Sequence, residues 1–236
     1  MIPIKILPQP DDVTCGPTSL HAVYQYYGEN LKLQEIIDEV KYLEEGGTLA
    51  VMLANHALMR GYNAEIYTYN LHLFDPTWFK NKNENIAEKL KMQLKHKKEK
   101  KLKFASEAYI HFLELGGKVS YHDLNVKFLR NFFENRVPVL TGLNATYLYN
   151  CSREYTNENN QSIYDDVKGY TTGHFVVLYG YDEEKKHVIV ADPYKENPVS
   201  HNNYYSVRIG RLINSIMLGI VSYDANLLII TPKGKV

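Results

Sequence analysis

The hydrophobic pattern of this sequence changes its period near Val137, and this change constrains the fold more than any other feature. Before Val137, apolar residues recur mostly at the three- and four-residue spacing of helices, and after it they recur mostly in the short apolar runs of strands. Helices that precede the strands of an antiparallel sheet are typical of the α+β class. We therefore expect an α+β fold.

The first part of the chain predicts helices with one apolar face each. Leu20, Val23 and Tyr24 share a face of the first helix, which begins near Pro17 and stops at Gly28. Further helices are expected at 33–43, 48–60, 83–101, 104–115 and 123–136, with one strand at 63–69.

The last part predicts an antiparallel sheet. Residues 175–181 and 188–191 form two apolar runs joined by a polar turn, which is typical of a β-hairpin. Residues 150–173 are polar and predict a long exposed loop. We expect a single domain over residues 1–236, with N-terminal helices packed on a C-terminal antiparallel sheet. The remaining expected elements are strands at 138–143 and 227–231, a helix at about 204–218 and a helical insertion at about 70–135.

The charge and composition exclude several classes of protein. The chain has 236 residues, 27 basic and 27 acidic, so it lacks the overall positive charge of a dedicated nucleic-acid-binding protein. It has no run of about 18 apolar residues that would predict a membrane span. Prolines interrupt the N-terminus, where a signal peptide would need an apolar segment. We therefore expect a soluble cytoplasmic protein without a nucleic-acid or membrane partner, and the oligomeric state stays unpredicted.

Cys15 is the first candidate for chemistry, because it lies at the expected start of the first helix. A helix start supplies N–H donors and the positive end of the dipole, which favour the nucleophilic thiolate. Gly16 leaves room for a substrate backbone, and Gln9 is near enough in sequence to complete an oxyanion hole with the Cys15 N–H. The alternative is a buried structural cysteine. Cys151 has neither a helix start nor a neighbouring histidine and is assigned no role.

His174 is the candidate base among the nine histidines. It follows Gly173 at the head of one strand of the predicted hairpin, and Asp192 ends the partner strand. Folding the hairpin about its turn brings the two side chains roughly opposite each other, so that the carboxylate can orient the imidazole. The alternative is a histidine at a sheet edge and an aspartate that begins a turn before Pro193.

These segments together resemble the C39-type, bacteriocin-processing cysteine peptidases of the papain-like fold. The resemblance rests on Gln9, on Cys15-Gly-Pro-Thr-Ser-Leu, on Gly173-His-Phe-Val-Val-Leu and on Ala191-Asp-Pro193, in that order. It implies a papain-like fold in which Cys15 is the nucleophile, His174 the base, Asp192 the orienting acid and Gln9 the oxyanion donor. Unlike the exporter-linked members, this sequence has no membrane segment and no phosphate-binding loop, and 159 residues separate its cysteine from its histidine.

The sequence thus predicts a cysteine peptidase that hydrolyses an amide bond of a peptide or protein substrate. We expect no cofactor and no metal, since no His, Cys and Asp cluster has metal-site spacing. Two alternatives stay open: an amide acyltransferase that uses the same site, and an inactive peptide-binding module. The lysine-rich segment 80–103 is interpreted as a solvated helix face.

Overall fold

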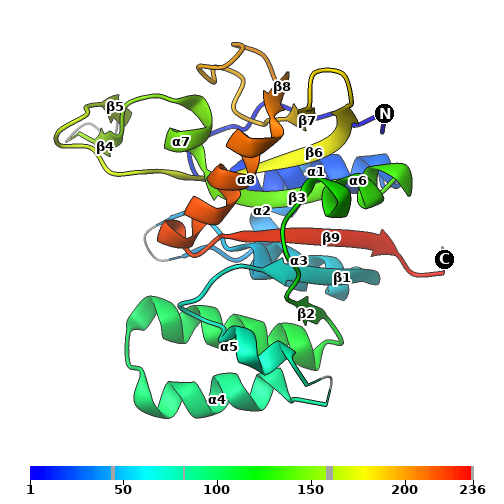
Figure 1. Ribbon diagram of the computed structural model, residues 1–236, viewed down its shortest axis with the longest axis vertical. Helices are drawn as coiled ribbons and strands as arrows, with labels where there is room; N and C mark the ends of the chain where they lie inside the picture. The colour runs from blue at the N-terminus through cyan, green and yellow to red at the C-terminus, as the bar shows by residue number, and fades with distance from the viewer. Residues whose placement is uncertain (44–45, 82, 158–161, 235–236) are drawn as a thin grey trace.

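A computed structural model describes residues 1–43, 46–81, 83–157 and 162–234. In this part of the chain a seven-stranded sheet forms the centre, with the strand order β2-β1-β9-β3-β6-β7-β8 (Figure 1). Its strands are β1 (Tyr62–Thr68), β2 (Lys118–Ser120), β3 (Val139–Asn144), β6 (Gly173–Asp182), β7 (His187–Ala191), β8 (Tyr204–Arg208) and β9 (Asn226–Pro232).

The sheet is mixed, whereas the sequence predicted a purely antiparallel one. β2 pairs with β1 in parallel, and the other neighbouring strands described are antiparallel. The parallel pair arises because helices lie between β1 and β2 in the chain, and such a crossover returns the second strand in the same direction. The predicted α+β class is confirmed.

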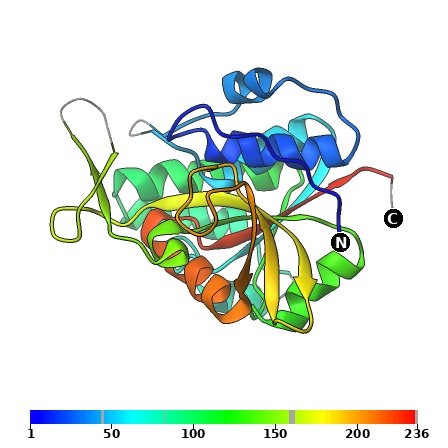
Figure 2. The ribbon, with the colours of Figure 1, turned by 90° about the horizontal axis from the view of Figure 1, so that it is seen from above.

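Helices cover both faces of the sheet (Figure 2). One face packs against α1 (Cys15–Tyr26) and α3 (Ala50–Met59), and α2 (Leu33–Glu39) lies against α1. The other face packs against α6 (Val126–Glu134), α7 (Ala145–Tyr149) and α8 (Ile209–Leu218). The sheet therefore separates two hydrophobic cores.

β6 runs between these two cores. Phe175 and Val177 face the core that contains α1, whereas Val176 and Leu178 face the core that contains α8. A strand covered on both faces needs apolar residues at successive positions, which explains the unbroken apolar run that follows His174. Among the residues described, no helix has the length and apolar character needed to cross a membrane.

The charged helix predicted at 83–101 extends too far at its C-terminal end. The chain reverses after α4 (Ile86–His96) and continues as α5 (Lys100–Glu114), which packs against α4. The reversal buries both Leu90 and Leu102 in the core that contains α1, which one straight helix would not allow. This helical hairpin lies beyond the β2 edge of the sheet (Figure 1).

Several other predicted helices are shorter in the structure, α2 and α3 among them. α2 stops at Glu39 because Val40 is extended, so 40–43 is not helical. Thr48 does not cap α3: its hydroxyl donates to the Lys41 carbonyl, and the Ala50 N–H donates to Asp224 at 3.1 Å. A residue 174 positions away thus accepts the hydrogen bond from an N–H at the start of α3.

Two segments near the end were also predicted wrongly. Residues 204–208 form β8 rather than helix, because Tyr205 and Val207 alternate with exposed neighbours. The predicted loop 150–173 contains a two-stranded hairpin, β4 (Glu154–Thr156) and β5 (Ser162–Tyr164). Two short 3-10 helices, η1 (Pro76–Phe79) and η2 (Gly219–Ser222), complete the elements described.

Candidate active site

Cys15 is the first residue of α1 and is 9% exposed. Gly16 behind it packs tightly, since a β-carbon there would lie 2.3 Å from Cγ2 of Thr48 and 3.4 Å from the Phe175 ring. The glycine is therefore needed to dock the helix start against the entry to α3 and against β6. The expectation that Gly16 leaves room for a substrate backbone stays a prediction.

His174 and Asp192 lie together at the end of the β6–β7 hairpin. The ring Nε2 of His174 is 2.8 Å from Oδ1 of Asp192. Pairing of Val177 with Ala191 sets the register that brings the two side chains together. His174 is 8% exposed and Asp192 is fully buried. The hairpin expected from the sequence thus positions an imidazole against a carboxylate.

The same histidine reaches the cysteine. The Cys15 thiol lies close enough to the His174 ring to raise its pKa, and because Nε2 faces Asp192, Nδ1 is the nitrogen left for the thiol. Burial lowers the pKa of His174, but the Asp192 carboxylate and the contact with Cys15 outweigh burial and raise the pKa above its usual value. The imidazolium form is therefore favoured beside the thiol.

Asp192 accepts four hydrogen bonds through its carboxylate. Oδ1 accepts from His174 and from the Tyr194 N–H, and Oδ2 accepts from the hydroxyls of Tyr149 and Tyr205, each at 2.8 Å. The sequence did not indicate Tyr149 or Tyr205, because nothing in it distinguishes them from the other tyrosines among a total of 20. Tyr205 also lies on β8, where the sequence predicted a helix. Both oxygens of the buried carboxylate are satisfied.

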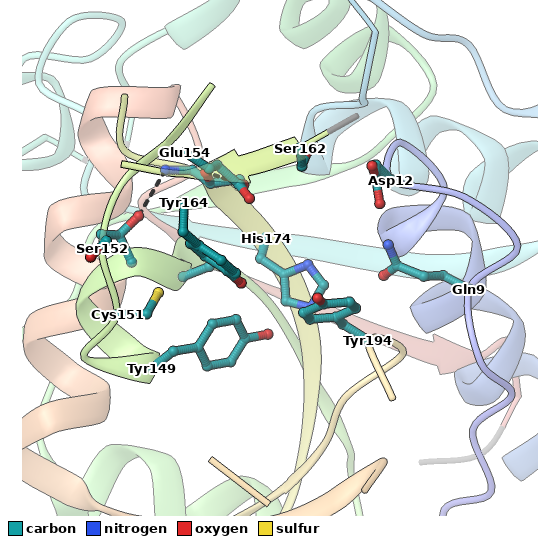
Figure 3. A pocket seen from close by; sticks show the side chains of 14 residues that line it. Gln9, Asp12, Tyr149, Cys151, Ser152, Glu154, Ser162, Tyr164, His174 and Tyr194 are labelled. Atoms are coloured by element: carbon teal, nitrogen blue, oxygen red, sulfur yellow. Dashed lines mark hydrogen bonds between the residues drawn. The ribbon is translucent and has the colours of Figure 1, made fainter. Parts of the chain in front are cut away.

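Gln9 is held beside this group by its backbone, whose N–H donates to the Pro193 carbonyl at 2.9 Å. Its side-chain Nε2 donates to the Asp11 carbonyl at 2.8 Å, which uses one of the two amide hydrogens. Its Oε1 is buried without a hydrogen-bond partner. The structure thus brings Gln9 to the pocket wall beside His174, with its amide directed in part toward Asp11 (Figure 3).

A pocket opens directly beside His174 (Figure 3). Its walls come from the segment before α1, from α7 and the residues after it, from the β4–β5 hairpin, and from the start of β6. Cys151, to which the sequence assigned no role, lines this pocket, and burial raises the pKa of its thiol. The side chains labelled in the figure are Gln9, Asp12, Tyr149, Cys151, Ser152, Glu154, Ser162, Tyr164, His174 and Tyr194.

Within the described ranges no group of three His, Cys, Asp or Glu side chains is arranged to hold a metal ion. His174 and the hydroxyls of Tyr149 and Tyr205 are instead connected through the Asp192 carboxylate. The arrangement is suited to proton transfer between a thiol and an imidazole held by a carboxylate.

An α+β chain in which an imidazole lies between a thiol at a helix start and a buried carboxylate is a cysteine-peptidase-like protein. The chain belongs to the Peptidase_C39 like family, which it matches over residues 1–211. The resemblance found in the sequence is therefore confirmed. No sequence among the curated proteins matches this chain.

Several solved structures are similar to this chain at low sequence identity. A protein assigned as a C39-like peptidase from Bacillus anthracis is 16% identical, covers 99% of this chain and 96% of its own, and has a TM-score of 0.52. The peptidase domain of Streptococcus ComA, a bi-functional ABC transporter involved in quorum sensing, is 16% identical over 98% of this chain and 99% of its own, with a TM-score of 0.44. Xylellain, a cysteine protease from Xylella fastidiosa, is 12% identical over 98% of this chain and 84% of its own, with a TM-score of 0.43. The likeness to the Bacillus protein confirms the predicted papain-like C39 fold.

Proposed function

We propose that this protein is a cysteine peptidase that hydrolyses an amide bond of a peptide or protein substrate. Cys15 acts as nucleophile, His174 as base and acid, Asp192 as the group that orients His174, and Gln9 as oxyanion donor. The observation that carries the proposal is that His174 lies beside Cys15 while its Nε2 is 2.8 Å from the Asp192 carboxylate. Nucleophile, base and orienting group are the three parts that thiol catalysis needs.

The reaction proceeds in two halves. The Cys15 thiolate attacks the substrate carbonyl carbon, and the resulting oxyanion accepts hydrogen bonds from the Cys15 N–H and the Gln9 amide. The imidazolium of His174 donates its proton to the leaving amine as the carbon–nitrogen bond breaks. His174 then takes a proton from water, which attacks the thioester, and the acid product and the thiol are released.

The buried carboxylate supports this cycle in two ways. It fixes the ring orientation of His174 through the Nε2 hydrogen bond, and its charge favours the imidazolium form. Its remaining hydrogen bonds, from Tyr149, Tyr205 and the Tyr194 N–H, keep the carboxylate itself from turning. An oriented imidazolium beside the thiol stabilises the thiolate that attacks.

The test is cysteine alkylation followed by peptide hydrolysis. At about pH 6, iodoacetamide should label Cys15 much faster than Cys151 on the folded protein, because an ion pair with imidazolium keeps a thiol reactive at this pH. The purified protein should also cleave members of a mixed peptide library, as read by mass spectrometry, whereas Cys15→Ala should not. Equal slow labelling of both cysteines, or cleavage that survives Cys15→Ala, would remove the proposal. Amide products that appear only with an added amine would favour the acyltransferase instead.

A further inference from the structure

We propose that the pocket beside His174 binds a positively charged amine or guanidinium group of the substrate, and that Glu154 and Asp12 determine this preference. The inference rests on the proposed function, because it assigns the substrate class of the same site. It follows from the charge of the pocket, from its aromatic walls and from the way the β4–β5 hairpin is attached.

The pocket carries two carboxylates that lack ionic partners. Glu154 and Asp12 lie on opposite sides of it (Figure 3). None of the lining residues described is a Lys or Arg. Neither carboxylate forms an ion pair with a cation in the described part of the chain. The pocket is therefore electronegative, and a narrow site lined by one sign of charge concentrates ligands of the opposite sign.

The hydrogen bonds of two neighbouring arginines go to carbonyl oxygens and not to these carboxylates. Arg153 donates to the Asp166 carbonyl, and Arg211 donates to the Tyr147 carbonyl at 2.9 Å. His174 is itself paired with the buried Asp192, so that pair is neutral when the imidazole is protonated. These cations therefore do not bind the carboxylates of Glu154 and Asp12.

Besides the carboxylates, tyrosine rings are the second feature of the pocket that suits a cation. Tyr149, Tyr164 and Tyr194 line the same pocket as the two carboxylates. The rings of Tyr149 and Tyr194 are 6.4 Å apart, and each lies 6.1 to 6.5 Å from the His174 ring. The faces of tyrosine rings attract ammonium and guanidinium groups, most strongly where water is partly excluded. Carboxylates and ring faces together select a cation over a neutral apolar group.

Glu154 is built into the site rather than free in solvent. It pairs with Tyr164 in the β4–β5 hairpin, its main chain exchanges hydrogen bonds with Tyr170, and one of its carboxylate oxygens accepts from the Thr172 hydroxyl. Tyr164, its partner in the hairpin, lines the same pocket. These contacts attach the hairpin to the segment that leads into the strand of His174.

The test uses thiol reagents that differ in charge. Methanethiosulfonates with a trimethylammonium, a sulfonate or a neutral group form a mixed disulfide with a thiol and release methanesulfinate. The rate at Cys15, followed by mass spectrometry and divided by the rate with free cysteine, should be roughly tenfold higher for the cation than for the anion. The preference should fall by about threefold in Glu154→Gln and in Asp12→Asn, and should weaken in high salt.

A matched control is available in Glu65→Gln. Glu65 also accepts a hydrogen bond from a hydroxyl, that of Ser120, but lies on β1 outside the pocket. Its substitution should leave the cation preference unchanged. Two charge variants are used so that a folding defect in one of them does not decide the result.

The outcomes separate this inference from the proposed function. Fast labelling of Cys15 with no preference for the cation, or a preference that both variants retain, overturns the inference and leaves the peptidase proposal intact. Slow labelling of Cys15 by every reagent counts against both. A final comparison uses peptides that differ only in lysine against acetyl-lysine, with and without free cadaverine. Faster cleavage of the lysine peptides assigns the cation to the peptide, and capture of cadaverine into an amide assigns it to a free amine.

Discussion

Asp192 receives more hydrogen bonds than the orientation of one histidine requires. Besides His174 and the Tyr194 N–H, it holds the hydroxyls of Tyr149 and Tyr205, which come from α7 and β8. The carboxylate thus connects elements on both sides of the β6–β7 hairpin. A buried charge of this kind is tolerable only because each oxygen is satisfied.

Removal of the Tyr205 hydroxyl tests that role. Tyr205→Phe should lower the free energy of unfolding by about 1–3 kcal/mol, because a hydrogen bond to a buried charge is lost and nothing replaces it. Urea denaturation measures the change. Tyr170→Phe is the control, since Tyr170 is 79% exposed and should have almost no effect. Equal stability of the Tyr205 variant and the wild type would mean that water or another donor substitutes for the hydroxyl.

Gln9 supports a prediction about rate rather than stability. Gln9→Ala should lower kcat by about 10²- to 10³-fold, because an oxyanion donor acts on the transition state, while labelling of Cys15 stays nearly unchanged. Steady-state kinetics on a substrate found in the library measure this. Gln34→Ala, which removes an exposed amide bound to Asp38, is the control. If Gln9→Ala left kcat unchanged, Gln9 would not be part of the catalytic site.

At the scale of elements, local patterns predicted the pieces that hold the candidate residues. The helix at Cys15 and the hairpin that joins His174 to Asp192 depend on nearby residues, and the sequence pattern indicated both. Their catalytic roles stay predictions. The sequence predicted a helix over β8 because the amphipathic helix α8 begins directly after it, at Ile209. The end of α4 was missed because charged residues continue through the turn at 97–99.

The helical hairpin of α4 and α5 depends on a few buried leucines. Leu90→Ala should destabilise the protein by about 2–5 kcal/mol, because Leu90 is fully buried and its loss leaves a cavity. Met92→Ala on the same helix is the control, since Met92 is 56% exposed. Thermal or urea unfolding distinguishes the two. Similar small effects would show that α4 contributes little to the core.

At the scale of the whole molecule, the strand order was beyond prediction from the sequence. β9, the last strand, lies between β1 and β3, and it pairs there with residues 84 to 170 positions away. Asp224, just before β9, caps α3 through Ala50. Such pairings depend on which surfaces of the chain pack together as it folds, and a local sequence pattern does not predict that packing.

Asp224 makes the stability of the molecule depend on pH. Burial raises the pKa of its carboxyl from 3.8 to about 7. Because the folded state holds the proton more tightly than the unfolded state, the stability that this group contributes is present below about pH 4 and is lost as pH rises toward 7. Asp224→Asn does not titrate and keeps an oxygen acceptor for Ala50.

The Asn variant should therefore be more stable than the wild type at pH 7.5, by on the order of 1–4 kcal/mol, and the difference should vanish below about pH 4. Urea unfolding across this pH range measures it. Asp166→Asn, at an exposed position, should show no such trend. A difference that is the same at every pH would contradict the assigned cause.

The division of the site between the first helix and a late hairpin has a consequence during synthesis. On the proposed mechanism, Cys15 leaves the ribosome before His174 and Asp192, which follow 159 and 177 residues later. Until those residues emerge and the β6–β7 hairpin docks against α1, the thiol lacks its proton acceptor. A growing chain is then inert toward itself and its neighbours, and activity begins only after Asp192 has emerged and the hairpin has docked.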